Sequence, residues 1–175
     1  MKIKLKNVRI SFPEIFKPGV KFNTYGGEFR FSAKSGIKEQ LEEAINAEGV
    51  SAFGEKWPSI KESLQTKGKM LKVCSGKEKE YSDDFFFRAY NKARPEVRGR
   101  NAEVLTFEDR VIYSGCRVDI QLDVSAYQQK VYGPVVSVKL LSVQFRGDDE
   151  PLSSAPRAEE ADFEKISDGA DDDDL

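Results

Sequence analysis

The part of this sequence best equipped to bind a ligand is residues 85–100, FFFRAYNKARPEVRGR, where flat rings and positive charges occur together. If the stretch begins as a β-strand, successive side chains point to opposite faces, so Phe85, Phe87 and Ala89 would face a core. The side chains expected on the outer face are Phe86, Arg88 and Tyr90. Rings beside a guanidinium group suit single-stranded nucleic acid, because bases stack on the rings and cations follow the phosphates. We therefore predict that Phe86 and Tyr90 stack on bases.

Other cations and tyrosines could extend this surface. The predicted phosphate contacts are Arg30, Arg88, Lys92, Arg94, Arg98, Arg100 and Arg117. For any single one of them a solvated surface charge is an equally good interpretation, and the cluster carries more weight than its members. Further candidate rings are Tyr25, Tyr113, Tyr127 and Tyr132, although a half-buried tyrosine with its hydroxyl in water is just as ordinary.

Catalytic chemistry is restricted because the sequence contains no histidine. This excludes histidine acid–base catalysis, nucleophiles activated by histidine, and zinc sites that mix histidine with cysteine. Carboxylates acting with magnesium remain possible at Asp83–Asp84 and Glu108–Asp109. Adjacent acids are more often solvated loop residues, and neighbours in a strand point apart. We expect no enzyme activity, metal or cofactor; the alternatives are a magnesium-dependent nuclease and an adaptor that binds no DNA.

The net charge of −2 conceals two segments of opposite charge. Residues 1–147 carry 26 Lys and Arg against 18 Asp and Glu, whereas residues 148–175 carry 2 against 12. The acidic segment also lacks periodic apolar positions, so we predict a disordered C-terminal tail. A tethered anion could compete with nucleic acid for a basic groove. The segment expected to recruit partners is Asp171, Asp172, Asp173, Asp174 and Leu175.

The elements that would position the ligand-binding residues are mostly β-strands. Apolar alternation is clearest in CRVDIQLDVSA, residues 116–126, which is typical of a half-buried antiparallel strand. Other strands are predicted at 2–12 with a bulge near Lys6 and Asn7, at 28–33, 69–74 and 83–91, and at 135–145. In the last strand, Leu140 and Leu141 indicate either another bulge or an end where both faces of the strand are covered. A turn-rich charged segment, RPEVRGRN, separates two of them.

Two helices are predicted between these strands. The first places Ile37, Leu41 and Ile45 on one face, with Gly49 positioned to end it. The second contains Trp57, Ile60 and Leu64, and we expect Trp57 to be a core residue before a stacking ring. A mainly β fold follows: an OB-fold-like, five-stranded antiparallel barrel with inserted helices in residues 1–147, followed by the tail in residues 148–175.

The expected location is the cytoplasm. No stretch approaches the roughly 18 apolar residues of a membrane span, and MKIKLKNVRI is not a secretion signal. Cys74 and Cys116 lie in apolar, strand-like settings, which fits reduced buried thiols better than a disulfide.

Three blocks of the sequence resemble a family of small bacteriophage single-stranded-DNA-binding proteins: FFFRAYNKARPEVRGRN, VIYSGCRVDIQLDVSAY and VSVKLLSVQFRGDDEPL. The resemblance covers most of residues 1–150. It implies an OB-fold that binds single strands without sequence preference during phage replication and recombination, in the cytoplasm of the bacterial host. It also implies an acidic tail that meets replication or recombination proteins. The oligomeric state stays open between monomer and homodimer.

The same resemblance implies positions for DNA contacts. These positions are Arg88, Asn91, Lys92, Arg94 and Arg98, together with the segment from Tyr127 to Tyr132, which includes Lys130.

Overall fold

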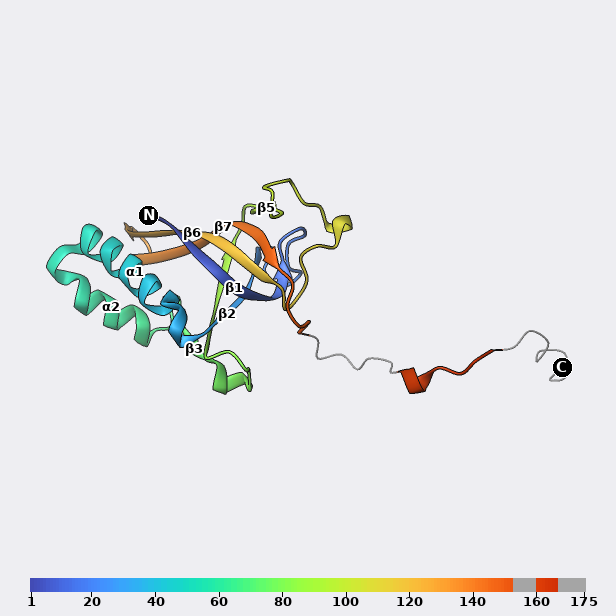
Figure 1. Ribbon diagram of the computed structural model, residues 1–175. Coiled ribbons are helices and arrows are strands. Elements are labelled where there is room, and N and C mark those ends of the chain that lie inside the picture. Colours follow the sequence, from blue (N-terminus) through green and yellow to red (C-terminus); the bar gives the residue numbers. More distant parts are fainter. Residues whose placement is uncertain (153–159, 167–175) are drawn as a thin grey trace.

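The computed structural model describes residues 1–152 and 160–166, and it places a β-barrel beside a pair of helices (Figure 1). The strands are β1 (Lys2–Glu14), β2 (Tyr25–Phe31), β3 (Cys74–Ser75), β4 (Phe85–Asn91), β5 (Glu96–Arg98), β6 (Arg117–Gln129) and β7 (Gly133–Gly147). The helices are α1 (Ile37–Phe53) and α2 (Trp57–Thr66). Short 3₁₀ turns are η1 (Ala33–Ser35), η2 (Gly54–Lys56), η3 (Gly76–Lys79), η4 (Phe107–Asp109) and η5 (Glu160–Asp162). The predicted partner-binding residues 171–175 lie outside the described residues.

Five strands close into the barrel in the order β4, β2, β1, β6, β7. Neighbours along this order pair antiparallel, and the ring closes where Tyr90 on β4 pairs in parallel with Lys139 on β7. A three-stranded meander joined to a further hairpin and closed by a parallel pair is the OB-fold arrangement. The prediction of a mainly β, five-stranded barrel with inserted helices is confirmed.

The apolar alternation of β6 builds much of the core. Val118, Ile120, Leu122 and Val124 are each 0% exposed, as their spacing predicts. The bulge expected near Lys6 and Asn7 occurs, and of the two alternatives at Leu140 and Leu141 the structure has the bulge. The pairing of β1 with β6 shifts between Leu5 and Val8, and the pairing of β6 with β7 shifts where Leu140 and Ser142 flank the extra residue.

The two helices pack against each other and against one end of the barrel. Trp57 is buried in a cluster with Leu64, Val124 and Val136, which confirms its core role. Gly49 does not end α1, because the helix continues to Phe53. A Cβ atom at Gly49 would lie 2.2 Å from Cε2 of Trp57, so the glycine lets the indole approach the helix.

Two further expectations are corrected. Of residues 69–74, predicted as a strand, only Cys74 lies in one, the short β3. Leu71 and Val73 pack on the barrel core, while Met70 packs on the helical cluster. The charged segment near residue 96 is not a simple turn either. Its residues form β5, which pairs in parallel with β7.

The start of the acidic segment is bound to the barrel. The backbone N–H of Leu152 donates to the carbonyl of Ser114 at 2.8 Å, and Arg9 donates to the carbonyl of Glu150. Asp149 accepts a hydrogen bond from Nε of Arg117 at 2.8 Å. The charge of residues 148–152 predicts that they belong to the tail, whereas their hydrogen bonds attach them to the folded part.

Within the described residues, no helix is long and apolar enough to cross a membrane. Both cysteines carry free thiols, and burial raises the pKa of Cys116.

Candidate nucleic-acid interface

The outward side of β4 presents a ring and a cation together. Tyr90 is 41% exposed, and the side chain of Arg88 is 53% exposed. The ring of Tyr90 lies against the bare backbone of Gly26 on β2, where a Cβ would come within 2.3 Å of its Cδ1. Lys139, exposed on β7, is the pairing partner of Tyr90 across the barrel closure. The pair predicted at Arg88 and Tyr90 is thus on the surface.

The turn after β4 carries two more cations. Asn91 donates through Nδ2 to the carbonyl of Leu140 at 3.0 Å, and its Oδ1 accepts from the backbone N–H of Ala93 at 3.1 Å. Asn91 therefore ties β4 to β7 and shapes the turn. Lys92 and Arg94, both exposed, stand on that turn. Asn91 thus shapes the turn that carries these two exposed cations.

A buried carboxylate lies beneath Arg88. Glu28 is 2% exposed, and it accepts hydrogen bonds from Ser11 Oγ at 3.0 Å and from Arg88 Nε at 3.2 Å. Nε of Arg30 lies 3.4 Å from Oε1 of Glu28, the oxygen that also accepts from Ser11. Burial, followed by the neighbouring Glu28 carboxylate, raises the pKa of Tyr81. The network fixes the orientation of Arg88 and leaves the far side of its guanidinium exposed.

Two predicted DNA contacts are corrected by the structure. Phe86 is 3% exposed and Arg30 is 4% exposed, although both lie on the outer face of the barrel as their parity requires. The loop that contains η3 covers them. Tyr81 from this loop packs edge-on against Phe86 at 5.2 Å between ring centres, and the guanidinium of Arg30 stacks 3.3 Å from the centre of the Tyr81 ring. Neither side chain is accessible to a base or a phosphate.

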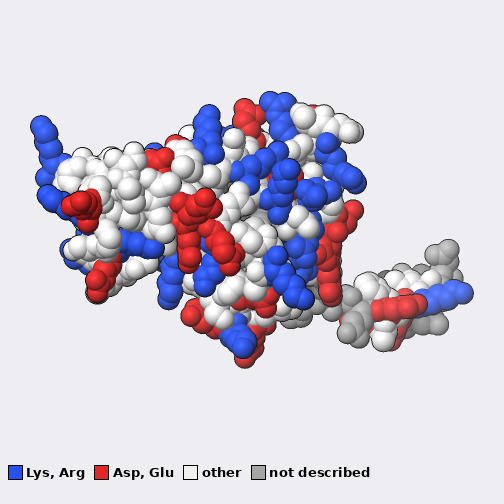
Figure 2. All heavy atoms as spheres, turned by 60° about the vertical axis from the view of Figure 1, so that its left-hand side comes forward, with Lys and Arg blue, Asp and Glu red and all other residues white. Residues whose placement is uncertain are grey.

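Three other predicted cations differ in their environment. Arg98 forms an ion pair with Glu96 at 3.0 Å, and Arg117 forms one with Asp149 at 2.8 Å, so part of each charge is neutralised. Arg100 is exposed in the loop after β5. Figure 2 shows Lys and Arg gathered on the part of the molecule away from the helices, with acidic side chains at the border of the patch.

The β6–β7 turn holds a second group of predicted contacts. Tyr127, Lys130 and Tyr132 are all exposed, and Tyr132 is 73% exposed. The adjoining parts of β6 and β7 pack on the helices through Val124 and Val136. This turn is therefore at the helical end of the barrel, whereas Arg88 and Tyr90 lie on the side wall of the barrel.

Sequence reasoning missed the aromatic rings of the β1–β2 loop, because this Pro- and Gly-rich stretch fits a packed connector slightly better than a ligand-binding arm. Phe22 in this loop is 76% exposed, and Phe12 near the end of β1 is 57% exposed. Phe107 in η4, whose ring centre lies 6.2 Å from that of Phe16 in the loop, is 59% exposed. Lys21 lies 5.2 Å from the ring centre of Phe22, and Lys17 lies 5.5 Å from that of Phe107. The available indication in the sequence was a lysine next to each phenylalanine of this stretch, Phe16–Lys17 and Lys21–Phe22.

The carboxylate pairs proposed for a magnesium nuclease have local structural roles. Asp84 accepts from the backbone N–H of Ala33 at 2.7 Å, and Asp109 completes a capping box with Thr106. Asp83 faces Arg9 at 3.9 Å. Across residues 1–152 and 160–166, no three Asp, Glu, Cys or His side chains come together in a way that could hold a metal ion.

Comparison with solved structures gives the same fold. A C-terminally truncated single-stranded DNA-binding protein from bacteriophage Enc34 superposes with a TM-score of 0.64 at 24% identity, over 86% of this chain and 88% of that one. The same bacteriophage protein in complex with ssDNA gives a TM-score of 0.63 at 24% identity, over 87% and 89% of the two chains. Gp2.5, a single-stranded DNA-binding protein encoded by bacteriophage T7, gives 0.52 at 13% identity, over 90% and 98%.

Sequence comparison extends over the whole chain. A putative protein p50 from Acyrthosiphon pisum secondary endosymbiont phage 1 is 33% identical over an alignment 178 positions long, which covers 95% of each chain. The family model described as Enterobacter phage Enc34, ssDNA-binding protein, matches residues 1–175. The chain therefore belongs to the family of the Enterobacter phage Enc34 ssDNA-binding protein.

Proposed function

We propose that this chain is a phage single-stranded-DNA-binding protein that coats single strands without sequence preference and catalyses no reaction. The observation that carries the proposal is the joint exposure of Tyr90 and Arg88 on β4, the third strand of the meander, which pairs with the second strand, β2. That face and the adjoining loops are where OB-folds bind oligonucleotides. Membership in a family of ssDNA-binding proteins supports it.

Binding would combine two kinds of contact. A base stacks on Tyr90, and exposed rings of the β1–β2 loop, such as Phe22, accept bases further along the strand. Arg88, Lys92, Arg94 and Lys139 contact phosphates, with Arg100 and the β6–β7 turn as outer contacts. Every base offers a flat face to a ring, so this surface needs no base code.

The acidic tail has two proposed roles. It competes with DNA for the cationic surface, because residues 148–175 carry 12 acidic against 2 basic side chains. Its end, residues 171–175, recruits replication or recombination proteins of the phage or host. The protein would act in the cytoplasm of the bacterial host, as a monomer or homodimer.

Fluorescence anisotropy with labelled single- and double-stranded oligonucleotides at two salt concentrations tests this proposal. We expect preference for the single strand and an affinity that falls steeply with salt, since about 0.7 counterion is released per phosphate contact on single strands. Equal affinity for both DNA forms, or an affinity unaffected by salt, would contradict it.

The competition role needs a separate variant in the full-length chain. Changing residues 171–174 from Asp to Asn should raise ssDNA affinity at low salt, and the gain should shrink at high salt as the charges are screened. Unchanged affinity at both salt concentrations would remove the competition role and leave ssDNA binding intact.

A further inference from the structure

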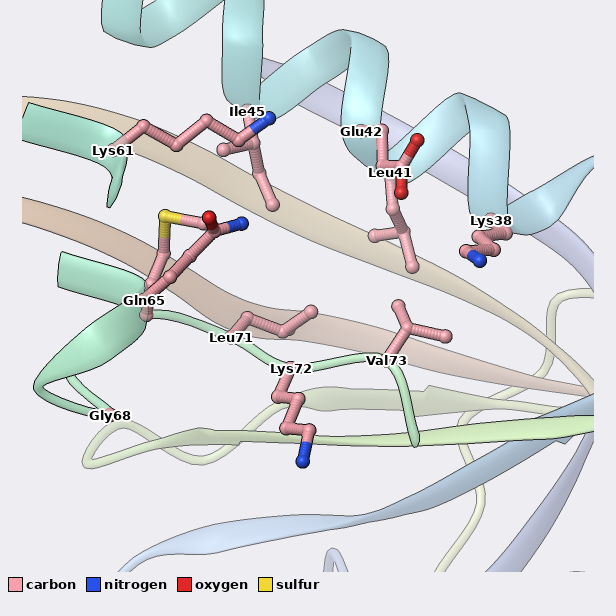
Figure 3. A pocket seen from close by; sticks show the side chains of 11 residues that line it. Lys38, Leu41, Glu42, Ile45, Lys61, Gln65, Gly68, Leu71, Lys72 and Val73 are labelled. Atoms are coloured by element: carbon pink, nitrogen blue, oxygen red, sulfur yellow. The ribbon is translucent and has the colours of Figure 1, made fainter. Parts of the chain in front are cut away.

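A groove with an apolar floor and a cationic rim lies between the helices and residues 68–73. It encloses about 480 Å³, within the range of ligand pockets. Leu41 and Ile45 from α1 face Leu71 and Val73 across it (Figure 3). Lys38, Lys61 and Lys72 line it against a single acid, Glu42. We call this site the lysine-rimmed groove.

The chemistry of this groove differs from that of the ssDNA surface. Its lining contains no aromatic side chain, so it offers no base a stacking partner. Met70, Leu71 and Val73 are only partly buried, so apolar surface remains available for an occupant. An occupant must therefore supply apolar side chains and negative charge together.

One segment of the chain has that composition. Residues 160–166, EADFEKI, contain three acids and one lysine around Phe163 and Ile166. Phe163 is 72% exposed and Ile166 is 89% exposed, and in Figure 1 the segment stands clear of the barrel. Large apolar side chains left in water on an acidic segment match a groove with exposed apolar surface and lysines at its rim.

A series of contacts leads from the base of the tail to the edge of the groove. Arg9 connects the two regions, since it lies 3.8 Å from Asp149 and 3.9 Å from Asp83. Phe85 follows two residues later, and Lys38 of the groove lies 4.8 Å from its ring centre. The chain between Leu152 and Phe163 spans about 35 Å when extended, so Phe163 can lie far from the point where Leu152 is bound to the barrel.

From these observations we propose that residues 160–166 dock into the lysine-rimmed groove of their own chain, with Phe163 and Ile166 on its apolar floor and their acidic neighbours at Lys38, Lys61 and Lys72. Docking would hold the middle of the tail beside the helices and leave residues 171–175 free for their proposed roles. The proposal does not depend on ssDNA binding.

Methyl NMR of the full-length protein tests this docking without DNA. The double variant Phe163→Ser, Ile166→Ser should shift the methyl signals of Leu41, Ile45, Leu71 and Val73 and leave those of Ile120 in the barrel unchanged. High salt should move the wild-type groove signals toward those of the variant, because it screens the lysine rim. The matched control Val50→Ser removes an exposed apolar side chain of α1, 56% exposed and outside the groove lining, and should leave the groove signals in place.

Groove methyl signals that are identical in wild type and double variant would overturn the proposal. Shifts that grow with protein concentration would place the segment of a second copy in the groove and overturn docking within one chain. Anisotropy with single-stranded DNA on the same samples tests the proposed function separately from docking. If the segment does not dock, the affinity for DNA is unaffected. If the protein does not bind DNA, the methyl comparison still tests docking.

Discussion

Tyr90 and Phe86 lie on the same outer face of β4 with Arg88 between them, and we expect changes at Tyr90 to affect DNA binding and changes at Phe86 to affect stability. Tyr90 is 41% exposed, so Tyr90→Ala removes little packing but deletes a stacking partner. Stacking of one base contributes about 1–3 kcal/mol, which corresponds to a loss of affinity of roughly 5- to 150-fold. Phe86 is 3% exposed under Tyr81, so Phe86→Ala should lower the free energy of unfolding by about 3–5 kcal/mol.

Urea denaturation and anisotropy with a labelled oligothymidine measure these two effects separately. Phe86→Leu serves as the matched variant for binding, because it keeps an apolar side chain in the site and should cost only about 1 kcal/mol of stability. We expect Phe86→Leu to bind the oligonucleotide like wild type and Tyr90→Ala to unfold like wild type. If Phe86→Leu weakened binding as much as Tyr90→Ala while remaining folded, the loop containing η3 would have to open for DNA, and the argument from burial would fail.

Three other perturbations test the charges. Arg94→Gln should reduce the slope of log affinity against log salt by about 0.7, because one phosphate contact is lost; a salt titration with an unchanged slope would exclude Arg94 from the contact surface. Glu28→Gln should destabilise the fold by about 3–5 kcal/mol, because the buried Arg30 loses its counter-charge, and urea denaturation that matches wild type would show that this network contributes nothing. Asp149→Asn should lower the melting temperature at pH 7, and the difference from wild type should shrink in acid. Hydrogen bonding to the backbone N–H of Glu150, followed by Arg117, lowers the pKa of Asp149, so its stabilisation is present above the unfolded pKa of about 3.9 and is lost as pH falls through the folded pKa. Thermal unfolding from pH 7 into acid checks the sign, and a difference that grew as the pH fell would contradict it.

Alternation along the chain predicted the barrel because it reports which side of a sheet each residue occupies. It placed Val118 to Val124 correctly in the core, and it placed Phe86 and Arg30 correctly on the outer face. It could not show that the loop with η3 folds back over that face, since Tyr81 meets Arg30 only in three dimensions. Parity gives the face of a strand, and tertiary packing decides whether that face reaches solvent.

Glycine and charge were ambiguous for similar reasons. Glycine is typical of a helix end, but Gly49 lies within α1 and allows the ring of Trp57 to pack against the helix backbone. This contact depends on how α1 and α2 cross. Residues 148–152 are acidic enough to suggest a solvated tail. They bind the barrel because Arg9 and Arg117 present donors to them, and these donors lie far away in the sequence.

The ring of strands has a seam where β4 meets β7. Tyr90 and Lys139 form the parallel pair there, and the amide of Asn91 adds a cross-link to the carbonyl of Leu140. Since Tyr90 and Lys139 stand on either side of this seam, a nucleotide chain that contacts both would hold β4 and β7 together. Bound DNA would then slow the opening of the seam, and amide hydrogen exchange would fall along β4 and β7 even at positions that the DNA does not cover.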